Sequence, residues 1–208
     1  GFAVLLYGWD TTWYFYTVVL PGFGSGEYNG LLVPIQIFGN HSIPNLWSQL
    51  WPHAGRGLSI WARYASLLTT VGLLCVTMVL CRRPPNSLMG QYARWCALTL
   101  VMLVIPVYTY EHHLIWAMPG VILTALAVLQ GRFGLLGAAI LGLSWMGWAI
   151  SLKWLKSVAL SGVEHGWYAP FMFALQEWKS FSCIVLWIAL LVLVYRDHPP
   201  RVLEEQHV

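Results

Sequence analysis

Charged side chains are scarce in this sequence. Asp, Glu, Lys and Arg make up 9% of its 208 residues and apolar residues make up 58%, whereas a soluble domain carries about 25% charged residues. Because a soluble fold of this length does not need so much apolar surface, the excess must face lipid. The formal net charge is only +3 and no basic stripe is present, so nucleic acid is not expected as a partner. We predict an integral membrane protein.

Common catalytic and cofactor motifs are also missing. There is no nucleophile elbow, P-loop, dinucleotide fingerprint or HExxH sequence, so soluble-type hydrolase or NTPase chemistry has no support. The cysteines show no CxxC or other ligand spacing, and we interpret them as small apolar residues of apolar runs. They are Cys75, Cys81, Cys96 and Cys183. We expect no metal site and no cofactor.

The first apolar segment, residues 1–9, has neither a Met nor a basic start and does not resemble a signal peptide. It is typical of the end of a longer apolar segment. We therefore expect the chain to be a fragment, a split subunit or part of a longer protein.

Long apolar runs follow, and a helix needs about 20 apolar residues to cross a bilayer. Together with the apolar segment of residues 1–9, these runs predict an all-α polytopic membrane protein with about five to six transmembrane helices. The helix bundle is expected to comprise residues 58–195. Glu111-His112-His113 interrupts one long run and is expected to form a tight turn between two helices. Glycines such as Gly142 and Gly147 are suited to close helix packing. The runs are residues 58–80, 96–110, 114–130, 133–152 and 181–195.

The Arg and Lys residues indicate the orientation. Arg82, Arg83 and Arg94 lie in one loop, and Arg132 and the tail of residues 196–208 fall on the same side, which the positive-inside rule assigns to the cytoplasm. Residues 10–57, 111–113 and 153–179 are then expected to share the non-cytoplasmic face.

Residues 10–57 are predicted to form an interfacial or re-entrant segment on that face. The stretch PGFGSG at residues 21–26 follows an aromatic, β-branched run and is expected to break any helix there. Ser42, two residues before Pro44, predicts a new helix start.

Glu111, His112 and His113 are the first candidate site. Ionisable groups at a membrane helix boundary are costly unless used or paired, and two imidazoles beside a carboxylate could bind a lipid-linked phosphate. A solvated interfacial turn is the alternative. Metal or haem binding is a weaker one, because adjacent histidines on a helix point about 100° apart.

Asn40 and Ser42 are the second candidate site, since both could hydrogen-bond a sugar or phosphate; a capped helix start is the alternative. Arg56 and Arg63 could meet a phosphate or simply extend to the interface. Asp10 is a conceivable general base or a helix cap. Glu164, His165 and Glu177 could border an acceptor groove.

Two stretches together suggest a family. The sequence Asn40-His41-Ser42-Ile43, preceded by YFYTVVLP at residues 14–21, is followed later by YEHHLIWAMP at residues 110–119. Over residues 8–128 this pattern resembles the C-terminal half of the polyprenol-phosphate-mannose-dependent mannosyltransferases, glycosyltransferase family eighty-seven of the GT-C superfamily. His41 stands where that family has Gln.

The resemblance implies a GT-C-like fold and a membrane glycosyltransferase, or its C-terminal part, in a bacterial plasma membrane. It would transfer a sugar, mannose by the resemblance, from a polyprenyl-phosphate donor on the non-cytoplasmic face. The family's general base is an Asp in an earlier outer loop, so we expect the base to lie outside this chain. Donor binding is expected from Asn40, Ser42, Arg56, Glu111, His112 and His113. The alternative is a non-catalytic transmembrane subunit of a larger membrane complex, with membrane lipid and other subunits as partners.

Overall fold

The computed structural model describes residues 4, 7–25, 35, 39–53, 57–164 and 169–197. This part of the chain is helical and contains no strand. Three helical stretches are long and apolar enough to cross a membrane: Ile60–Cys81, Glu111–Leu129 and Trp178–Arg196. A fourth span results if the bent pair of Leu135–Ala149 and the following helix counts as one. The structure therefore confirms an all-α protein with three to four candidate spans.

All five predicted apolar runs contain a helix, but not all of these helices are long. The helix α5 (Ile60–Cys81) and the helix α11 (Trp178–Arg196) have 22 and 19 residues. By contrast, α6 (Leu88–Val104) has 17 and α8 (Leu135–Ala149) has 15. At 1.5 Å per residue the shorter pair spans about 22–26 Å, below the bilayer core of about 30 Å.

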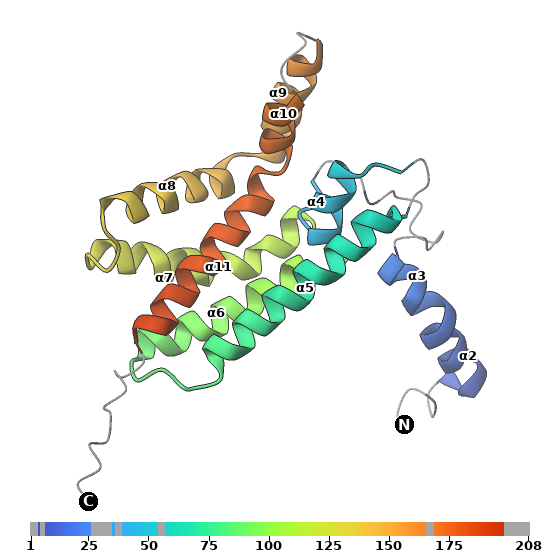
Figure 1. The fold of residues 1–208 in the computed structure, drawn as a ribbon, viewed down its shortest axis with the longest axis horizontal. Coiled ribbons are helices and arrows are strands. Elements are labelled where there is room, and N and C mark those ends of the chain that lie inside the picture. Colours follow the sequence, from blue (N-terminus) through green and yellow to red (C-terminus); the bar gives the residue numbers. More distant parts are fainter. Residues whose placement is uncertain are drawn as a thin grey trace, which may run out of the picture.

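The helix α11 is the centre of the bundle (Figure 1). It packs most extensively along α6 and α8, and Leu186 and Leu190 on it are fully buried. Of its most apolar window 56% is buried, against 17% for α5. The apolar side chains of α5 are therefore left mainly for lipid, while α11 supplies the protein core.

The long run around Glu111 breaks earlier than predicted. The helix α6 ends at Val104, residues 105–110 are not helical, and Glu111 then opens the 3-10 helix η3 (Glu111–Ala117), which leads into α7 (Met118–Leu129). Pro106 lies within the break, where its missing N–H cannot support a continuing helix. Glu111, His112 and His113 thus form the first turn of a helix and not the turn between two helices.

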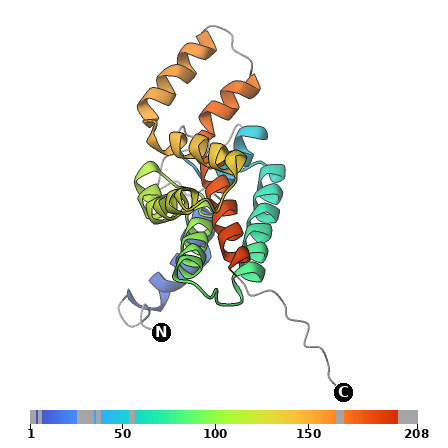
Figure 2. The same ribbon diagram turned by 90° about the vertical axis from the view of Figure 1, so that its left-hand side faces the viewer.

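The helices α9 and α10, which follow α8 in the sequence, project beyond the bundle at one end (Figures 1 and 2). The helix α9 (Leu152–Glu164) follows α8 after a bend of 95°. It is followed by α10 (Ala169–Gln176), and Glu177 separates α10 from α11. Both helices stand at the end of the bundle that carries α4 (Ile43–Leu50).

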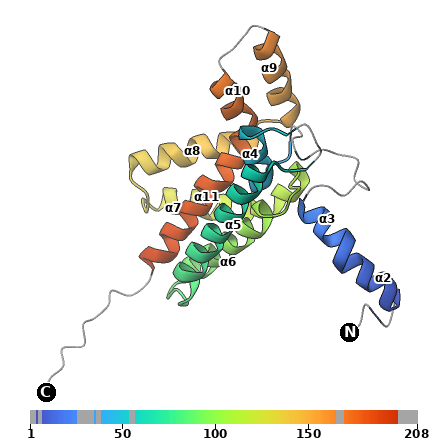
Figure 3. The ribbon, with the colours of Figure 1, turned by 45° about the vertical axis from the view of Figure 1, so that its right-hand side comes forward.

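The first helical stretch stands away from the bundle (Figures 1 and 3). It runs through α2 (Trp9–Tyr14), a π-helical turn η1 (Phe15–Val19) and α3 (Leu20–Ser25). The helix ends at Ser25, within the stretch of residues 21–26 that is predicted to break it, but Pro21 itself does not end it. Pro21 is the second residue of α3, directly after the π turn, where the usual backbone hydrogen bonds are already replaced and a missing N–H is tolerated.

The two ends of the bundle gather the groups expected to share a face. At one end the Asp197 carboxylate accepts a hydrogen bond from the Ser87 backbone N–H at 2.7 Å, and Arg196 donates to the Arg132 carbonyl at 2.6 Å. At the other end the Asn40 side chain meets Thr109. These contacts bring residues near 40 and 109 together at one end and residues near 87, 132 and 197 together at the other. The assignment of the loops to the two membrane faces stays a prediction.

Candidate functional site

A buried polar cluster occupies the end of the bundle where α4, the segment 105–110, η3 and the α10–α11 junction meet. Polar side chains at this depth in an apolar protein are costly unless each has a partner or a use. The members of the cluster are Asn40, His41, Ser42, Asn45, Ser48, Thr109, Glu177, Lys179 and Ser180, all at most 5% exposed.

Asn40 holds two segments of backbone together. Its Nδ2 donates to the Ile35 and Val107 carbonyls at 3.2 and 2.9 Å. Its Oδ1 accepts from the N–H groups of Thr109 at 2.9 Å and Ser42 at 3.3 Å. Both donors and both acceptor positions of the amide are thus used within the protein, and no polar atom of Asn40 is directed to a ligand.

Ser42 is the N-cap of α4. Its Oγ accepts from the Asn45 backbone N–H at 3.1 Å and donates to the Val107 carbonyl at 2.8 Å. The helix predicted after Ser42 is confirmed, and Trp47 and Trp51 stack with ring centroids 5.3 Å apart. The capped-helix interpretation accounts for Ser42, whereas the Asn40 side chain connects backbone segments and caps no helix.

Glu177 ties α4 to α11. Its Oε1 accepts from Asn45 Nδ2 at 2.9 Å and its Oε2 accepts from the Ser180 hydroxyl at 2.7 Å. Asn45 Nδ2 also donates to the Asn40 carbonyl at 2.6 Å. Burial raises the pKa of the Glu177 carboxyl to about 7, although both hydrogen bonds favour the charged form.

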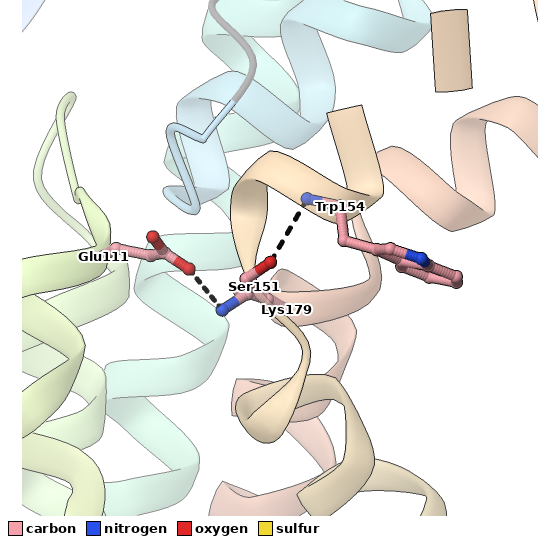
Figure 4. Close-up of polar contacts among 4 residues, drawn as sticks. All are labelled: Glu111, Ser151, Trp154 and Lys179. Carbon is pink, nitrogen blue, oxygen red and sulfur yellow. Dashed lines mark hydrogen bonds and ion pairs between the residues drawn. The ribbon is translucent and has the colours of Figure 1, made fainter. Parts of the chain in front are cut away.

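Lys179 pairs with Glu111 across the cluster (Figure 4). The distance from Nζ to Oε1 is 2.5 Å; the lysine side chain is 6% exposed and the glutamate side chain 40%. Lys179 therefore lies inside the protein, while Glu111 forms the solvent side of the pair. Beside them Ser151 caps the start of α9 by accepting from the Trp154 N–H at 3.2 Å.

His41 is buried next to this ion pair. Its backbone N–H donates to the Thr109 carbonyl at 2.7 Å, but neither ring nitrogen has a hydrogen-bond partner among the described residues. Burial and, to a smaller extent, the nearby Lys179 charge lower the pKa of the imidazole to about 4, although Glu111 acts in the opposite direction. His41 is consequently neutral at pH 7.

His112 and His113 lie together at the outer edge of the cluster, with ring centroids 4.1 Å apart. Nδ1 of His113 accepts from the Tyr110 backbone N–H at 3.2 Å, so the neutral ring carries its proton on Nε2. The Tyr110 ring stacks on His112 at 6.0 Å. The pair can therefore offer N–H donors beyond the protein.

An apolar groove of about 780 Å³ adjoins this edge. The first turns of α5 form one wall and the non-helical segment 105–110 forms the other. Tyr110 belongs both to the groove and to the stack with His112. The polar side chains of the groove are Arg63, Ser66, Thr70, Tyr108 and Tyr110.

The remaining candidates are dispersed. Arg56 and His165 lie outside the described residues. Asp10 is exposed in the first turn of α2 and makes no capping hydrogen bond. Glu164 ends α9. Among the described residues no group of three His, Cys, Asp or Glu is placed to hold a metal ion.

Sequence reasoning underestimated Glu177 and did not propose His41 or Lys179 as site residues. A signal was present, because Glu177 and Lys179 are two charges close to a long apolar run that nothing local neutralises. Their partners, Asn45 and Glu111, are 132 and 68 residues away in the sequence, which no local pattern reveals.

Comparison with known proteins adds no relative to this description. No protein-family model, no curated protein and no solved structure matches the chain.

Proposed function

We propose that this chain is a membrane glycosyltransferase, or the C-terminal part of one, that transfers a sugar from a polyprenyl-phosphate donor. Mannose is the sugar that the sequence resemblance favours, and the non-cytoplasmic face is the side that the Arg and Lys distribution favours. On this proposal the bundle is GT-C-like and has five to six spans.

The observation that carries the proposal is the continuity between an apolar groove and a histidine pair. Tyr110 lines the groove of about 780 Å³ and its ring stacks on His112. A polyprenyl phosphate has the matching arrangement, a long hydrocarbon chain that ends in a dianionic group. The apolar groove can hold the hydrocarbon chain of the lipid, and the N–H donors next to the groove can bind its phosphate.

The chemistry assigned to this chain is stabilisation of the leaving group. The acceptor hydroxyl oxygen attacks the anomeric carbon, its proton passes to a carboxylate base, and the carbon–oxygen bond to the phosphate breaks with its electron pair going to the phosphate. Negative charge grows on that phosphate, and Nε2–H of His113 and the His112 ring can donate to it. The base is assigned to a part of the enzyme outside this chain.

The test is release of polyprenyl phosphate from labelled polyprenyl-phosphate mannose, measured in nanodiscs with the enzyme that combines this chain and the part that carries the base, and with native membrane lipids as acceptor. Replacing both histidines (His112→Ala/His113→Ala) should slow release at least tenfold, since loss of one oxyanion donor costs about a hundredfold in other enzymes. His53→Ala is the matched control, because His53 is an exposed histidine beyond α4. Normal release by the double variant would refute the role of the pair.

One observation favours the alternative of a non-catalytic subunit. The stretch α2–α3 stands off the bundle and carries exposed aromatic side chains, among them Trp9, Trp13 and Tyr16. Such a helix could pack against a larger membrane protein. Purification in fixed stoichiometry with another membrane protein, with no bound polyprenyl lipid and no sugar release, would establish this alternative instead.

A further inference from the structure

We infer that the phosphate of the lipid donor is bound on the α5 wall of the groove, between the Arg63 guanidinium and the Ser66 hydroxyl. This inference rests on the proposed function and specifies where its substrate sits. Arg63 and Ser66 would contact the phosphate from the α5 side of the groove, in addition to the donors that His112 and His113 offer from η3 next to Tyr110.

Ser66 is the first reason. It lines the groove and is 6% exposed, and its hydroxyl has no hydrogen-bond partner among the described residues. A serine or threonine inside a membrane helix usually donates to the carbonyl one turn earlier. Thr77, Thr99 and Thr124 do so here, at 2.7, 3.0 and 2.9 Å. The Ser66 hydroxyl differs from these three, because it is buried without a hydrogen-bond partner among the described residues and it lines the groove, as Thr70 also does.

The unfavourable free energy of leaving the Ser66 hydroxyl without a hydrogen bond indicates that a ligand binds in the groove. A buried hydroxyl without a partner is destabilising, and rotation of the Ser66 side chain toward its own helix would remove the penalty. A ligand that brings an acceptor oxygen into the groove satisfies the hydroxyl without that rotation. Hydrocarbon alone cannot satisfy it.

Arg63 is the second reason. It lies one turn before Ser66 on α5, and both residues line the groove, as residues three apart share a helix face. Arg63 is in the first turn of the helix, at the polar end of the bundle, whereas Ser66 is about 4.5 Å deeper. An oxyanion at this level would meet the guanidinium at the membrane surface and the hydroxyl below it.

The other groove residues fit the hydrocarbon part. Leu67, Ile105 and Val107 line the groove with Ser66, and α5 continues toward the opposite end of the bundle as an apolar helix. A single prenyl chain could therefore leave the phosphate and run down α5 toward lipid. The contact between the Ser66 hydroxyl and the phosphate would then make the protein bind a polyprenyl phosphate more tightly than a polyprenol with the same hydrocarbon chain.

The experiment measures binding, not transfer, for the full chain in nanodiscs. Fluorescent polyprenyl phosphate is titrated against the wild type and against Ser66→Ala, Ser66→Thr and Arg63→Gln, with polyprenol and inorganic phosphate as competing probes. We expect Ser66→Ala and Arg63→Gln each to weaken binding of polyprenyl phosphate roughly tenfold, as loss of one charge-assisted hydrogen bond does. Ser66→Thr keeps a hydroxyl and should retain the affinity.

Two matched variants control for charge and for fold. Arg83→Gln removes the same charge beyond the far end of α5, and Thr99→Val removes a hydroxyl that is bonded within its own helix; neither should change the affinity. Melting temperatures show that each variant is folded.

Several outcomes overturn the inference. Equal affinity of the wild type for polyprenol and polyprenyl phosphate would mean that the groove holds hydrocarbon only. Equal competition by inorganic phosphate would mean that the site takes free phosphate, not a lipid head. Equal loss with Ser66→Ala and Ser66→Thr would mean that shape, not the hydroxyl, matters. If sugar is transferred but Ser66→Ala binds polyprenyl phosphate as tightly as the wild type, this phosphate site is refuted and the proposed function stands. If binding depends on Ser66 but no sugar is transferred, the proposed function is refuted and the phosphate site stands.

Discussion

Glu111 and Lys179 lie 68 residues apart in the sequence and meet at a distance of 2.5 Å. Glu111 opens the 3-10 helix η3 and Lys179 lies in the first turn of α11. The pair is asymmetric, because the lysine is almost wholly buried and the glutamate is 40% exposed. It therefore fixes the histidine-bearing turn to the central helix, and the two partners should respond differently to substitution.

Removal of Glu111 should cost more stability than removal of Lys179. Glu111→Gln leaves a buried ammonium group without its counter-charge, whereas Lys179→Met leaves a carboxylate that water can still reach. We expect losses of about 1–3 kcal/mol and about 1 kcal/mol, below the range for fully buried pairs because solvent partly screens this one. Thermal unfolding in detergent, followed by tryptophan fluorescence, gives both values. The double variant should lose less than the sum, and strict additivity would mean that the pair contributes nothing.

Asn40 should behave as a structural residue. Asn40→Ala removes a hydrogen bond from each of four backbone groups, of which only the Val107 carbonyl has another described side-chain partner, the Ser42 hydroxyl, and we expect a loss of about 2–4 kcal/mol. Asn40→Asp should be as harmful at pH 7, because a carboxylate oxygen would then face the Ile35 and Val107 carbonyls, and partly restored at low pH. A variant that unfolds normally but binds donor lipid poorly would instead support the ligand role predicted from the sequence.

His41 and Glu177 should give opposing pH dependences of stability. The folded-state pKa of His41 is about 4, below its ordinary value of 6.5, so His41 causes loss of stability as the pH falls from 6.5 to 4. The folded-state pKa of Glu177 is about 7, above its ordinary value of 4.5, so Glu177 causes loss of stability as the pH rises from 4.5 to 7. Between pH 4.5 and 6.5 the two effects largely offset each other in the wild type.

Single variants separate the two effects. With His41→Gln the melting temperature should rise as the pH falls from 7 to 4.5, because only the Glu177 effect remains. With Glu177→Gln it should fall as the pH falls from 6.5 to 4. Melting curves at half-unit pH steps provide the measurement, and identical profiles for the two variants would contradict the assignment.

Two glycines of α8 provide a matched test of helix packing. A Cβ on Gly147 would come within 2.6 Å of Trp178 Cδ1 and also against the Ser182 hydroxyl on α11, whereas a Cβ on Gly142 meets nothing within 4 Å. We expect Gly147→Ala to cost about 1–3 kcal/mol by overpacking. Gly142→Ala should be neutral or slightly stabilising, because alanine is the better helix former. Equal effects of the two substitutions on the melting temperature would show that α8 and α11 do not approach closely at Gly147.

The sequence alone determined the class of protein. A charged fraction of 9% and apolar runs of span length leave lipid as the only environment for this surface, and all five runs contain helices. Local chemistry also determined the start of α4, because Ser42, Pro44 and Asn45 lie within four residues and the cap depends only on them.

Only the tertiary structure decided which polar residues share a site and what each one does. Asn40 and Ser42 could bind a ligand or cap a helix, and the deciding contacts with Val107 come from 67 and 65 residues away. Likewise, the partners of Glu177 and Lys179 lie on other helices. Helical periodicity reports which face of one helix is apolar, but not which helix lies opposite. Burial, pairing and groove formation depend on that second helix, so they follow from packing and not from local sequence.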